Sequence, residues 1–241
     1  MTRVLNYIWR FWFLLLAFVL LIICIVPVYI LSYRKKDYPI AYWWIRFFCV
    51  TLFYGMGFRY SFHSLTSKNI NPGAQYVIIA NHTSIMDIML MVVLFPKHSI
   101  CFVGKKELEK IPLFGTVYKR ICVMVDRSSP RSRARVYQLC SERIKEGQSI
   151  VIFPEGGVTD DPKIILDDFK DGPFILANKH HHPLLVLTFI GLKEMFPFDN
   201  SKGHPGKVKV FLNDILDYNT NHQKLKETAF LQIKNTLEQN N

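Results

Sequence analysis

A histidine and an aspartate stand five residues apart, at His82 and Asp87, directly after the apolar run 76–80. A neutral imidazole can accept a proton from a hydroxyl near pH 7. A carboxylate on its other nitrogen selects the tautomer and stabilises the imidazolium that forms. His82 and Asp87 are therefore suited to act as a general base and its orienting partner, provided that their side chains meet.

The spacing decides where these side chains can meet. Five residues turn a continuous helix by roughly 500°, which leaves the two side chains about 140° apart. They can meet if His82 lies in a turn after a strand and Asp87 in the first turns of the next helix, because helical side chains lean toward the N-terminus. The residues between agree with this geometry, since Asn81, Thr83 and Ser84 are common cap residues and apolar residues follow at helical spacing.

A second group of turn residues, Phe153-Pro154-Glu155-Gly156, ends the apolar run 149–153. In α/β sheets, ligands bind beyond the carboxyl ends of the strands, where His82 is also expected. Glycine lets the backbone approach a ligand closely, and Glu155 can anchor a loop or a hydroxyl. Pro-Glu-Gly sequences are common in surface turns, so this group gains weight only in combination with His82 and Asp87.

Strand-like and helix-like segments alternate after residue 62. The strand-like runs are short, continuous and apolar, as expected of a sheet covered on both faces, and they are residues 76–80, 99–103, 121–125, 149–153, 184–190 and 207–212. One helix is bounded by Ser129 as cap, Pro130 at its first position and Gly147 past its end, and a terminal amphipathic helix is expected around residues 223–237. The predicted fold is therefore α/β, with a mixed, largely parallel sheet covered by helices.

The N-terminal region has the pattern of a membrane anchor. Residues 11–31 form 21 residues without a charge, close to the roughly 20 that a helix needs to cross the hydrocarbon core. The apolar core of a signal peptide is only roughly 7–15 residues long, and no small-x-small cleavage site follows this run. Residues 40–62 are aromatic but interrupted by Arg46, Gly55 and Gly57. This favours an interfacial helix over a second span or a helix packed on the first.

Two parts are therefore expected, namely a membrane anchor with interfacial helices over residues 1–62 and an α/β domain over residues 63–241. The net charge is +11, of which residues 1–60 contribute +6 and residues 97–135 contribute +7. Basic sequence beside an apolar anchor fits an anionic membrane surface, and without a recognisable nucleic-acid motif it does not indicate nucleic acid as a partner. The basic residues at 34–36 favour a cytoplasmic position for the domain.

Patterns for a metal or a disulfide are weak. The five cysteines are scattered and lack paired spacing, which fits a reducing compartment. The histidines at 180–182 have no accompanying carboxylate or cysteine spacing, and the acidic residues at 160–171 lack the calcium-loop pattern. We therefore expect neither a metal nor a bound cofactor.

Four blocks occur in a characteristic order, and they are Asn81-His82-x4-Asp87, residues 105–115, Asp126-Arg127 and Phe153-Pro154-Glu155-Gly156. With them the chain resembles the glycerolipid acyltransferase family that includes lysophosphatidate acyltransferases, over roughly residues 60–192. The resemblance implies transfer of a fatty acyl group from acyl-CoA or acyl-carrier protein to the hydroxyl of a lysophospholipid at a membrane. It implies His82 as the general base and Asp87 as its partner.

The resemblance also implies a substrate site. Lys105, Gly115 and Arg127 would shape the region of the acceptor and its phosphate. Residues 153–156 (Phe153, Pro154, Glu155 and Gly156) would bind a glycerol-type acceptor. The oxyanion formed during transfer needs N–H donors, for which we expect backbone amides after His82 or the glycines at 156–157.

One departure from the family pattern concerns the acceptor. The family's third block continues Glu-Gly-Thr-Arg, whereas this chain has Gly156-Gly157-Val158 after the glutamate. The missing arginine is the one expected to grip the acceptor phosphate, and valine cannot replace a bidentate clamp. The acceptor is therefore 1-acylglycerol-3-phosphate, giving phosphatidate, or another lysolipid such as a lyso-aminolipid. A non-catalytic lipid-binding protein is the third hypothesis, and it leaves the His82–Asp87 pair without a purpose.

Overall fold

The computed structural model describes residues 3–111, 114–126, 128–158 and 164–240. Seven strands of these segments form one sheet in the order β1-β7-β6-β2-β5-β3-β4. Neighbouring strands are parallel except for β6 and β7. The strands are β1 (Arg59–Ser64), β2 (Val77–Ile79), β3 (Ile100–Lys105), β4 (Val123–Val125), β5 (Ser149–Val151), β6 (Leu184–Ile190) and β7 (Lys207–Leu216). The predicted α/β fold with a mixed, largely parallel sheet is confirmed.

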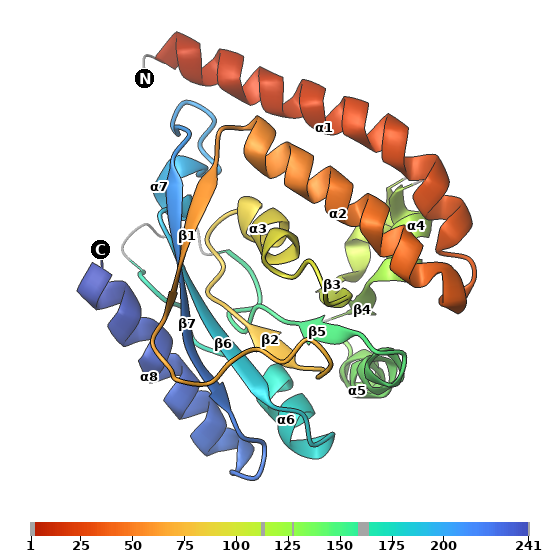
Figure 1. Ribbon diagram of the computed structural model, residues 1–241, viewed down its shortest axis with the longest axis vertical. Helices are drawn as coiled ribbons and strands as arrows, with labels where there is room; N and C mark the ends of the chain where they lie inside the picture. Colours follow the sequence, from red (N-terminus) through yellow and green to blue (C-terminus); the bar gives the residue numbers. More distant parts are fainter. Residues whose placement is uncertain (1–2, 112–113, 127, 159–163, 241) are drawn as a thin grey trace.

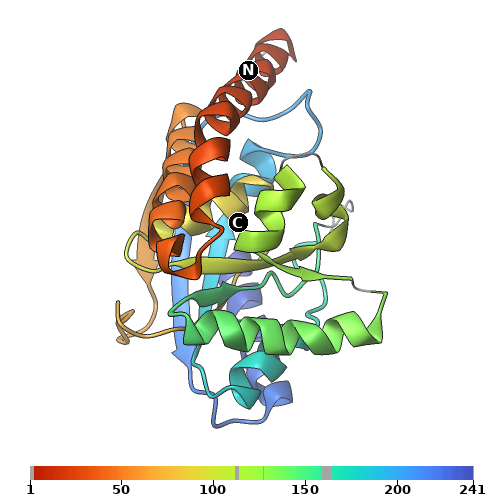
Figure 2. The ribbon, with the colours of Figure 1, turned by 90° about the vertical axis from the view of Figure 1, so that its right-hand side faces the viewer.

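Helices cover both faces of the sheet (Figures 1 and 2). One face carries α1 (Arg3–Leu31), α2 (Tyr38–Gly55) and α3 (Met86–Leu94), and the other carries α5 (Pro130–Lys145), α6 (Gly172–Lys179) and α8 (His222–Asn240). The shorter helices are η1 (Lys35–Asp37), η2 (Lys106–Lys110), α4 (Phe114–Ile121) and α7 (Leu192–Met195). A hydrophobic core lies on each face of the sheet, and β2 contributes to both because side chains alternate across a strand. Ile78 packs toward α2 and α3, whereas Val77 and Ile79 pack toward α6 and α8.

Six strands lie where the apolar runs predict them. β6 matches its predicted range, whereas β4 is shorter because Ile121 ends α4, and β7 continues to Leu216. The sequence does not predict β1, an edge strand whose side chains are mostly exposed and therefore show no apolar run. The predicted boundary between residues 62 and 63 falls inside β1, and the sheet begins at Arg59.

The aromatic segment 40–62 begins within α2, which packs between α1 and α3. This is the third arrangement considered for it, a helix packed on the first. Arg46, whose charge interrupts the apolar run, donates from Nη1 to the carbonyl oxygens of Val92 (2.6 Å) and Val93 (2.9 Å) at the end of α3. These carbonyls have no partner within their own helix, so Arg46 acts as a cap between helices.

The helix α1 is apolar throughout most of its length and lies along α2 (Figure 1). Among the described residues it is the one helix long and apolar enough to cross a membrane, judged by length and composition alone. Only 17% of its most apolar 18-residue window is buried against the protein. Its exposed face carries large apolar side chains, among them Val4, Ile8, Phe11, Leu14, Leu15, Phe18, Ile22, Val26 and Ile30. The predicted apolar N-terminal helix is thus confirmed.

The two helices with clear sequence boundaries also agree with prediction. The Ser129 side chain accepts a hydrogen bond from the Ser132 amide at the start of α5, and Pro130 is its first residue. Gly147, just past the end, has a φ of +83°, a conformation that glycine adopts without strain. The terminal helix α8 contains the predicted residues 223–237.

Candidate active site

The turn between β2 and α3 brings His82 and Asp87 together as the spacing predicts. His82 lies in the turn and Asp87 in the first turn of α3. The His82 Nδ1 and Asp87 Oδ2 atoms are 3.0 Å apart. The same oxygen accepts hydrogen bonds from the backbone amides of Thr83 (2.6 Å) and Ser84 (2.8 Å). Asp87 is fully buried, and all three donors compensate the desolvation of Oδ2, whereas Oδ1 has no hydrogen-bond partner among the described residues.

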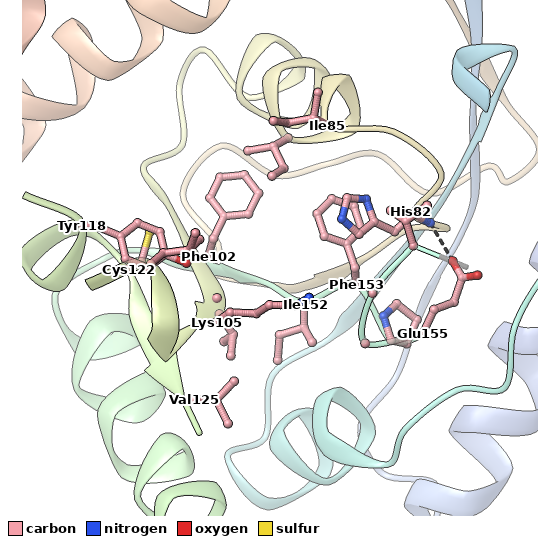
Figure 3. Close-up of a pocket in the computed structure, with 18 of the residues that line it drawn as sticks. His82, Ile85, Phe102, Lys105, Tyr118, Cys122, Val125, Ile152, Phe153 and Glu155 are labelled. Carbon is pink, nitrogen blue, oxygen red and sulfur yellow. Dashed lines mark hydrogen bonds between the residues drawn. The ribbon is translucent and has the colours of Figure 1, made fainter. Parts of the chain in front are cut away.

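The contact with Asp87 defines which nitrogen of His82 can act as a base. In the neutral tautomer that the carboxylate selects, Nδ1 carries the proton and donates it to Oδ2, which leaves the lone pair on Nε2. No described residue makes a hydrogen bond to Nε2. The imidazole ring stacks on Phe153, with 4.1 Å between ring centroids and an interplanar angle of 14° (Figure 3). Asp87 and Phe153 together fix the direction in which Nε2 points.

Glu155 supports the turn from the neighbouring strand. One carboxylate oxygen accepts the backbone amide of His82 (2.6 Å; dashed in Figure 3), and the other accepts the amide of Asp167 (3.0 Å). Glu155 is only 5% exposed, and this burial raises the pKa of its carboxyl to about 7, although the two amides favour the ionised form. Because both oxygens are occupied by main-chain donors, Glu155 anchors a loop, which is one of the two roles predicted for it.

His82 opens onto a large cleft of about 1920 Å³. Its walls are mostly apolar and come from α1, α2, α3, β3, α4 and the segment after β5. Phe102, Tyr118 and Ile152 lie in this cleft beyond His82 and Phe153 (Figure 3). A cavity of this size and lining suits a long hydrocarbon chain whose reactive end lies at Nε2.

The predicted substrate residues are distributed unevenly around the cleft. Lys105 is exposed at the end of β3 and lines the cleft, as do Pro154 and Gly156. Gly115 is not among the lining residues. It is buried in α4, where a Cβ atom would lie 2.0 Å from the Glu109 carbonyl oxygen, so the close packing of α4 on η2 explains why this residue is glycine. Arg127 lies outside the described residues.

The two predicted sources of oxyanion donors differ in availability. The amides of His82, Thr83 and Ser84 all donate to carboxylates, so the expectation that the turn supplies free donors is wrong for these three. The Gly156 amide donates to the Phe153 carbonyl. The Gly157 amide has no acceptor among the described residues, and Gly157 lines the cleft.

Asn81 has a role that the sequence did not predict. Its side chain was expected to cap a helix, but it bonds the backbone of Phe189 on β6 instead. The amide nitrogen donates to the Phe189 carbonyl and the amide oxygen accepts the Phe189 N–H, both at 2.8 Å. This pairing continues the β2–β6 ladder past the last residue of β2. No local signal could reveal it, because the partner is 108 residues away in sequence.

The described residues contain no group of three or more His, Cys, Asp or Glu side chains that could hold a metal ion.

Comparison with known proteins connects this geometry to a chemistry. A family model described as acyltransferase matches residues 62–190. The chain is 29% identical over 168 residues to a 1-acyl-sn-glycerol-3-phosphate acyltransferase of Chlamydomonas reinhardtii, a match that covers 69% of this chain and 49% of that protein. It is 30% identical over 148 residues to the enzyme of the same name from Helicobacter pylori, covering 58% of this chain and 60% of that protein. The chain thus matches about half the length of these relatives.

A solved structure shares the fold over nearly the whole chain. The crystal structure of a 1-acyl-sn-glycerophosphate acyltransferase from Thermotoga maritima superposes with a TM-score of 0.78, covering 99% of this chain and 97% of the other. The sequences are 24% identical over this match. At that identity the likeness describes the fold rather than the substrate.

Proposed function

The chain belongs to the acyltransferase family, and from that membership we propose that it moves a fatty acyl group from acyl-CoA or acyl-carrier protein to the free hydroxyl of a lysophospholipid. The proposed acceptor is 1-acylglycerol-3-phosphate, which would give phosphatidate, because the matched relatives carry that name. The observation that carries the proposal is the His82–Asp87 pair, whose free Nε2 opens onto an apolar cleft. A base at the mouth of a hydrocarbon-sized cavity suits acyl transfer to a hydroxyl.

The reaction follows from the orientation of His82. Nε2 removes the proton of the acceptor hydroxyl while its oxygen attacks the thioester carbonyl and forms the new C–O bond. Asp87 stabilises the imidazolium through Nδ1. The tetrahedral intermediate then collapses, the C–S bond breaks, and the imidazolium returns its proton to the departing thiolate. The Gly157 amide is a donor available to the oxyanion.

Direct transfer is favoured over a covalent acyl-enzyme. The Ser84 hydroxyl beside His82 is fully buried and donates to the Phe196 carbonyl. Cys122 lines the cleft, but burial raises the pKa of its thiol well above the ordinary value, which makes it a poor nucleophile. A thioester is already activated, so a positioned hydroxyl and a base suffice.

Lys105 supports a phosphate-bearing acceptor. It is exposed at the carboxyl end of β3 and lines the same cleft as His82 (Figure 3). An ammonium group there can neutralise part of the charge of a phosphate whose glycerol hydroxyl lies at Nε2. In this proposal Lys105 holds the acceptor headgroup and the apolar walls hold the acyl chains.

A second candidate acceptor is a lysolipid without the glycerol phosphate, such as a lyso-aminolipid. Val158 lines the cleft, so an apolar side chain stands where the resembling family has an arginine. A lone lysine forms weaker and less directional phosphate contacts than a lysine with a bidentate arginine. This observation keeps the alternative acceptor open to test.

We also propose that the exposed face of α1 attaches the protein to the bilayer from the cytoplasmic side. The apolar side chains along α1 support attachment, because so many large apolar groups on one surface are rare in proteins that face only water. The basic residues at 34–36 next to α1 support the cytoplasmic orientation.

The test is transfer of labelled acyl chains by the purified full chain on vesicles of phosphatidylethanolamine and phosphatidylglycerol. Acyl-CoA and acyl-carrier protein are compared as donors, and the lysolipid acceptors include 1-acylglycerol-3-phosphate and a lyso-aminolipid. We expect phosphatidate to form and the protein to sediment with the vesicles. His82→Ala is the variant expected to abolish transfer.

Each outcome tests a different part of the proposed function. Preference for the aminolipid would replace the proposed acceptor, and activity that survives His82→Ala would disprove the proposed base. Absence of transfer to every acceptor would favour the lipid-binding hypothesis. Protein that stays in the supernatant would contradict the proposed attachment.

A further inference from the structure

Arg10 is a charged residue within the apolar helix α1, and it is only 7% exposed. A buried guanidinium is costly unless its charge and its N–H groups are compensated. Asn6, one turn earlier on the same face of α1, is also buried. Two buried polar residues in line indicate that this end of α1 is docked on a polar surface of the protein.

That surface is the segment 196–202. Arg10 donates from Nη2 to the carbonyl oxygens of Pro197 (2.6 Å) and Lys202 (3.0 Å). Its guanidinium lies 3.7 Å from the centre of the Phe196 ring, within the range of a cation–π contact. Asn6 donates to the carbonyl oxygen of Ser201 (2.7 Å). All these acceptors are main-chain oxygens or a ring face, so α1 fixes the course of this segment rather than the position of one side chain.

The close approach of Arg10 depends on a glycine next to the segment. Gly203 has a φ of +122°, and a Cβ atom there would lie 3.2 Å from Arg10 Nη2 and 2.7 Å from the Met195 carbonyl oxygen. Any other residue would strain the backbone and crowd the arginine. The chain is therefore shaped locally to accept Arg10.

The other side of the same segment contacts the catalytic turn. The carbonyl oxygen of Phe196 accepts a hydrogen bond from the Ser84 hydroxyl (2.8 Å), and Ser84 is fully buried. The backbone amide of Ser84 donates to Asp87 Oδ2, the oxygen that also contacts His82 Nδ1. Phe196 is thus held by Arg10 through its ring and holds Ser84 through its carbonyl group.

We propose that Arg10 is a positioning residue for the active site. By fixing segment 196–202 against α1, it fixes the Phe196 carbonyl to which the turn of His82 is bonded through Ser84. The N-terminal helix is then part of the catalytic architecture and not only a membrane attachment. For its kinetic readout this inference rests on the proposed acyl-transfer function.

Membrane attachment is the competing explanation of Arg10, because arginines at the ends of apolar helices often reach for lipid headgroups. Arg10→Leu separates the two explanations. The substitution makes α1 more apolar and leaves its exposed face intact, so vesicle binding is expected to stay the same. The two carbonyl contacts and the ring contact of segment 196–202 are lost.

The matched control is Arg3→Leu, which removes the same charge from an exposed position of the same helix. With the full chain on phosphatidylethanolamine–phosphatidylglycerol vesicles, we expect Arg10→Leu to lower kcat about tenfold, because misplacement of a catalytic group by a fraction of an ångström reduces rate steeply. The KM values should change by less than kcat, because Phe198 is the one residue of segment 196–202 that lines the cleft. Arg3→Leu should match the wild type. Equal kcat in the two variants would overturn the proposal.

A double-mutant cycle with Ser84→Ala tests the connection itself. If Arg10 acts through Phe196 and Ser84, the loss in the double variant should be smaller than the product of the two single losses. Independent, multiplicative losses would show that Arg10 does not act through Ser84.

Should Arg10→Leu fail to fold, Arg10→Lys replaces it. Lysine keeps the charge without the planar fork, so a several-fold loss of kcat is expected and an unchanged kcat contradicts the proposal.

A readout without substrate separates this inference from the proposed function. In protein with ¹³C-labelled histidine, the His82 ring signals, assigned with His82→Ala, should move in Arg10→Leu and stay in place in Arg3→Leu. This comparison remains decisive if the wild type transfers no acyl group to any acceptor. Unmoved His82 signals in Arg10→Leu would overturn the positioning role.

Discussion

Two buried carboxylates, which follow neighbouring strands of the sheet, support the same histidine in different ways. Asp87, after β2, contacts the imidazole of His82 and the amides of Thr83 and Ser84. Glu155, after β5, contacts only main-chain amides, one of them that of His82 itself. Asp87 therefore acts on the reacting group, whereas Glu155 acts on the chain that carries it.

This difference shows how reactive and supporting residues can be told apart at one sheet edge. None of the described residues bonds Nε2 of His82, which lines the cleft, while both oxygens of Glu155 are occupied. A group whose hydrogen-bonding capacity is satisfied internally has none left for a substrate. Glu155 is thus better explained as a loop anchor than as the acceptor-binding residue that the resemblance implied. Three predictions sharpen this comparison.

The largest effect is expected for Asp87→Asn. The amide keeps the size of the side chain but removes the charge that selects the Nδ1–H tautomer and stabilises the imidazolium, so kcat should fall by about 10²–10⁴. Steady-state transfer kinetics measure this effect. Asp214→Asn, the same change in a surface ion pair with Lys68, is the control and should be nearly neutral. A loss below tenfold for Asp87→Asn would mean that Asp87 does not act on the imidazole.

A smaller effect is expected for Glu155→Gln. The new amide oxygen can accept one of the two main-chain N–H groups, but its NH₂ group faces the other, so one anchor is lost. We expect kcat to fall about tenfold with little change in the KM of the acceptor. A rise in acceptor KM at unchanged kcat would show instead that Glu155 binds the acceptor, which would remove the contrast with Asp87.

The smallest effect concerns stability and pH. Burial raises the pKa of Glu155 from 4.5 to about 7, so between these values the folded protein binds a proton that the unfolded chain does not. Glu155 therefore contributes stability that is present below about pH 4.5 and is lost as the pH rises through about 7. As the pH rises from about 4.5 to about 7, the unfolding free energy of the wild type should therefore fall relative to that of Glu155→Gln. Denaturant unfolding at several pH values measures it. A difference that moves the other way would indicate that the two amides outweigh burial.

The sequence predicted the reactive pair because its information is local. A strand, a cap-rich turn and a helix within twelve residues suffice to place His82 against Asp87, and short apolar runs suffice to place six of the strands. The same reasoning missed β1, whose exposed edge position leaves no apolar pattern. It interpreted residues 40–62 through their aromatic content, although α2 is held by packing on α1 and α3 and by Arg46 at the end of α3.

The supporting contacts of the site were decided by the tertiary structure alone. Glu155 reaches the amide of His82 across 73 residues, Asn81 reaches Phe189 across 108, and Arg10 reaches Pro197 across 187. Each of these side chains bonds main-chain atoms, which every residue possesses, so the partner's identity leaves no trace in the sequence. The amino-acid types therefore determined which group can take a proton. The arrangement of β2, β5 and β6, with α1 packed along α2, decided which groups hold that proton acceptor in place.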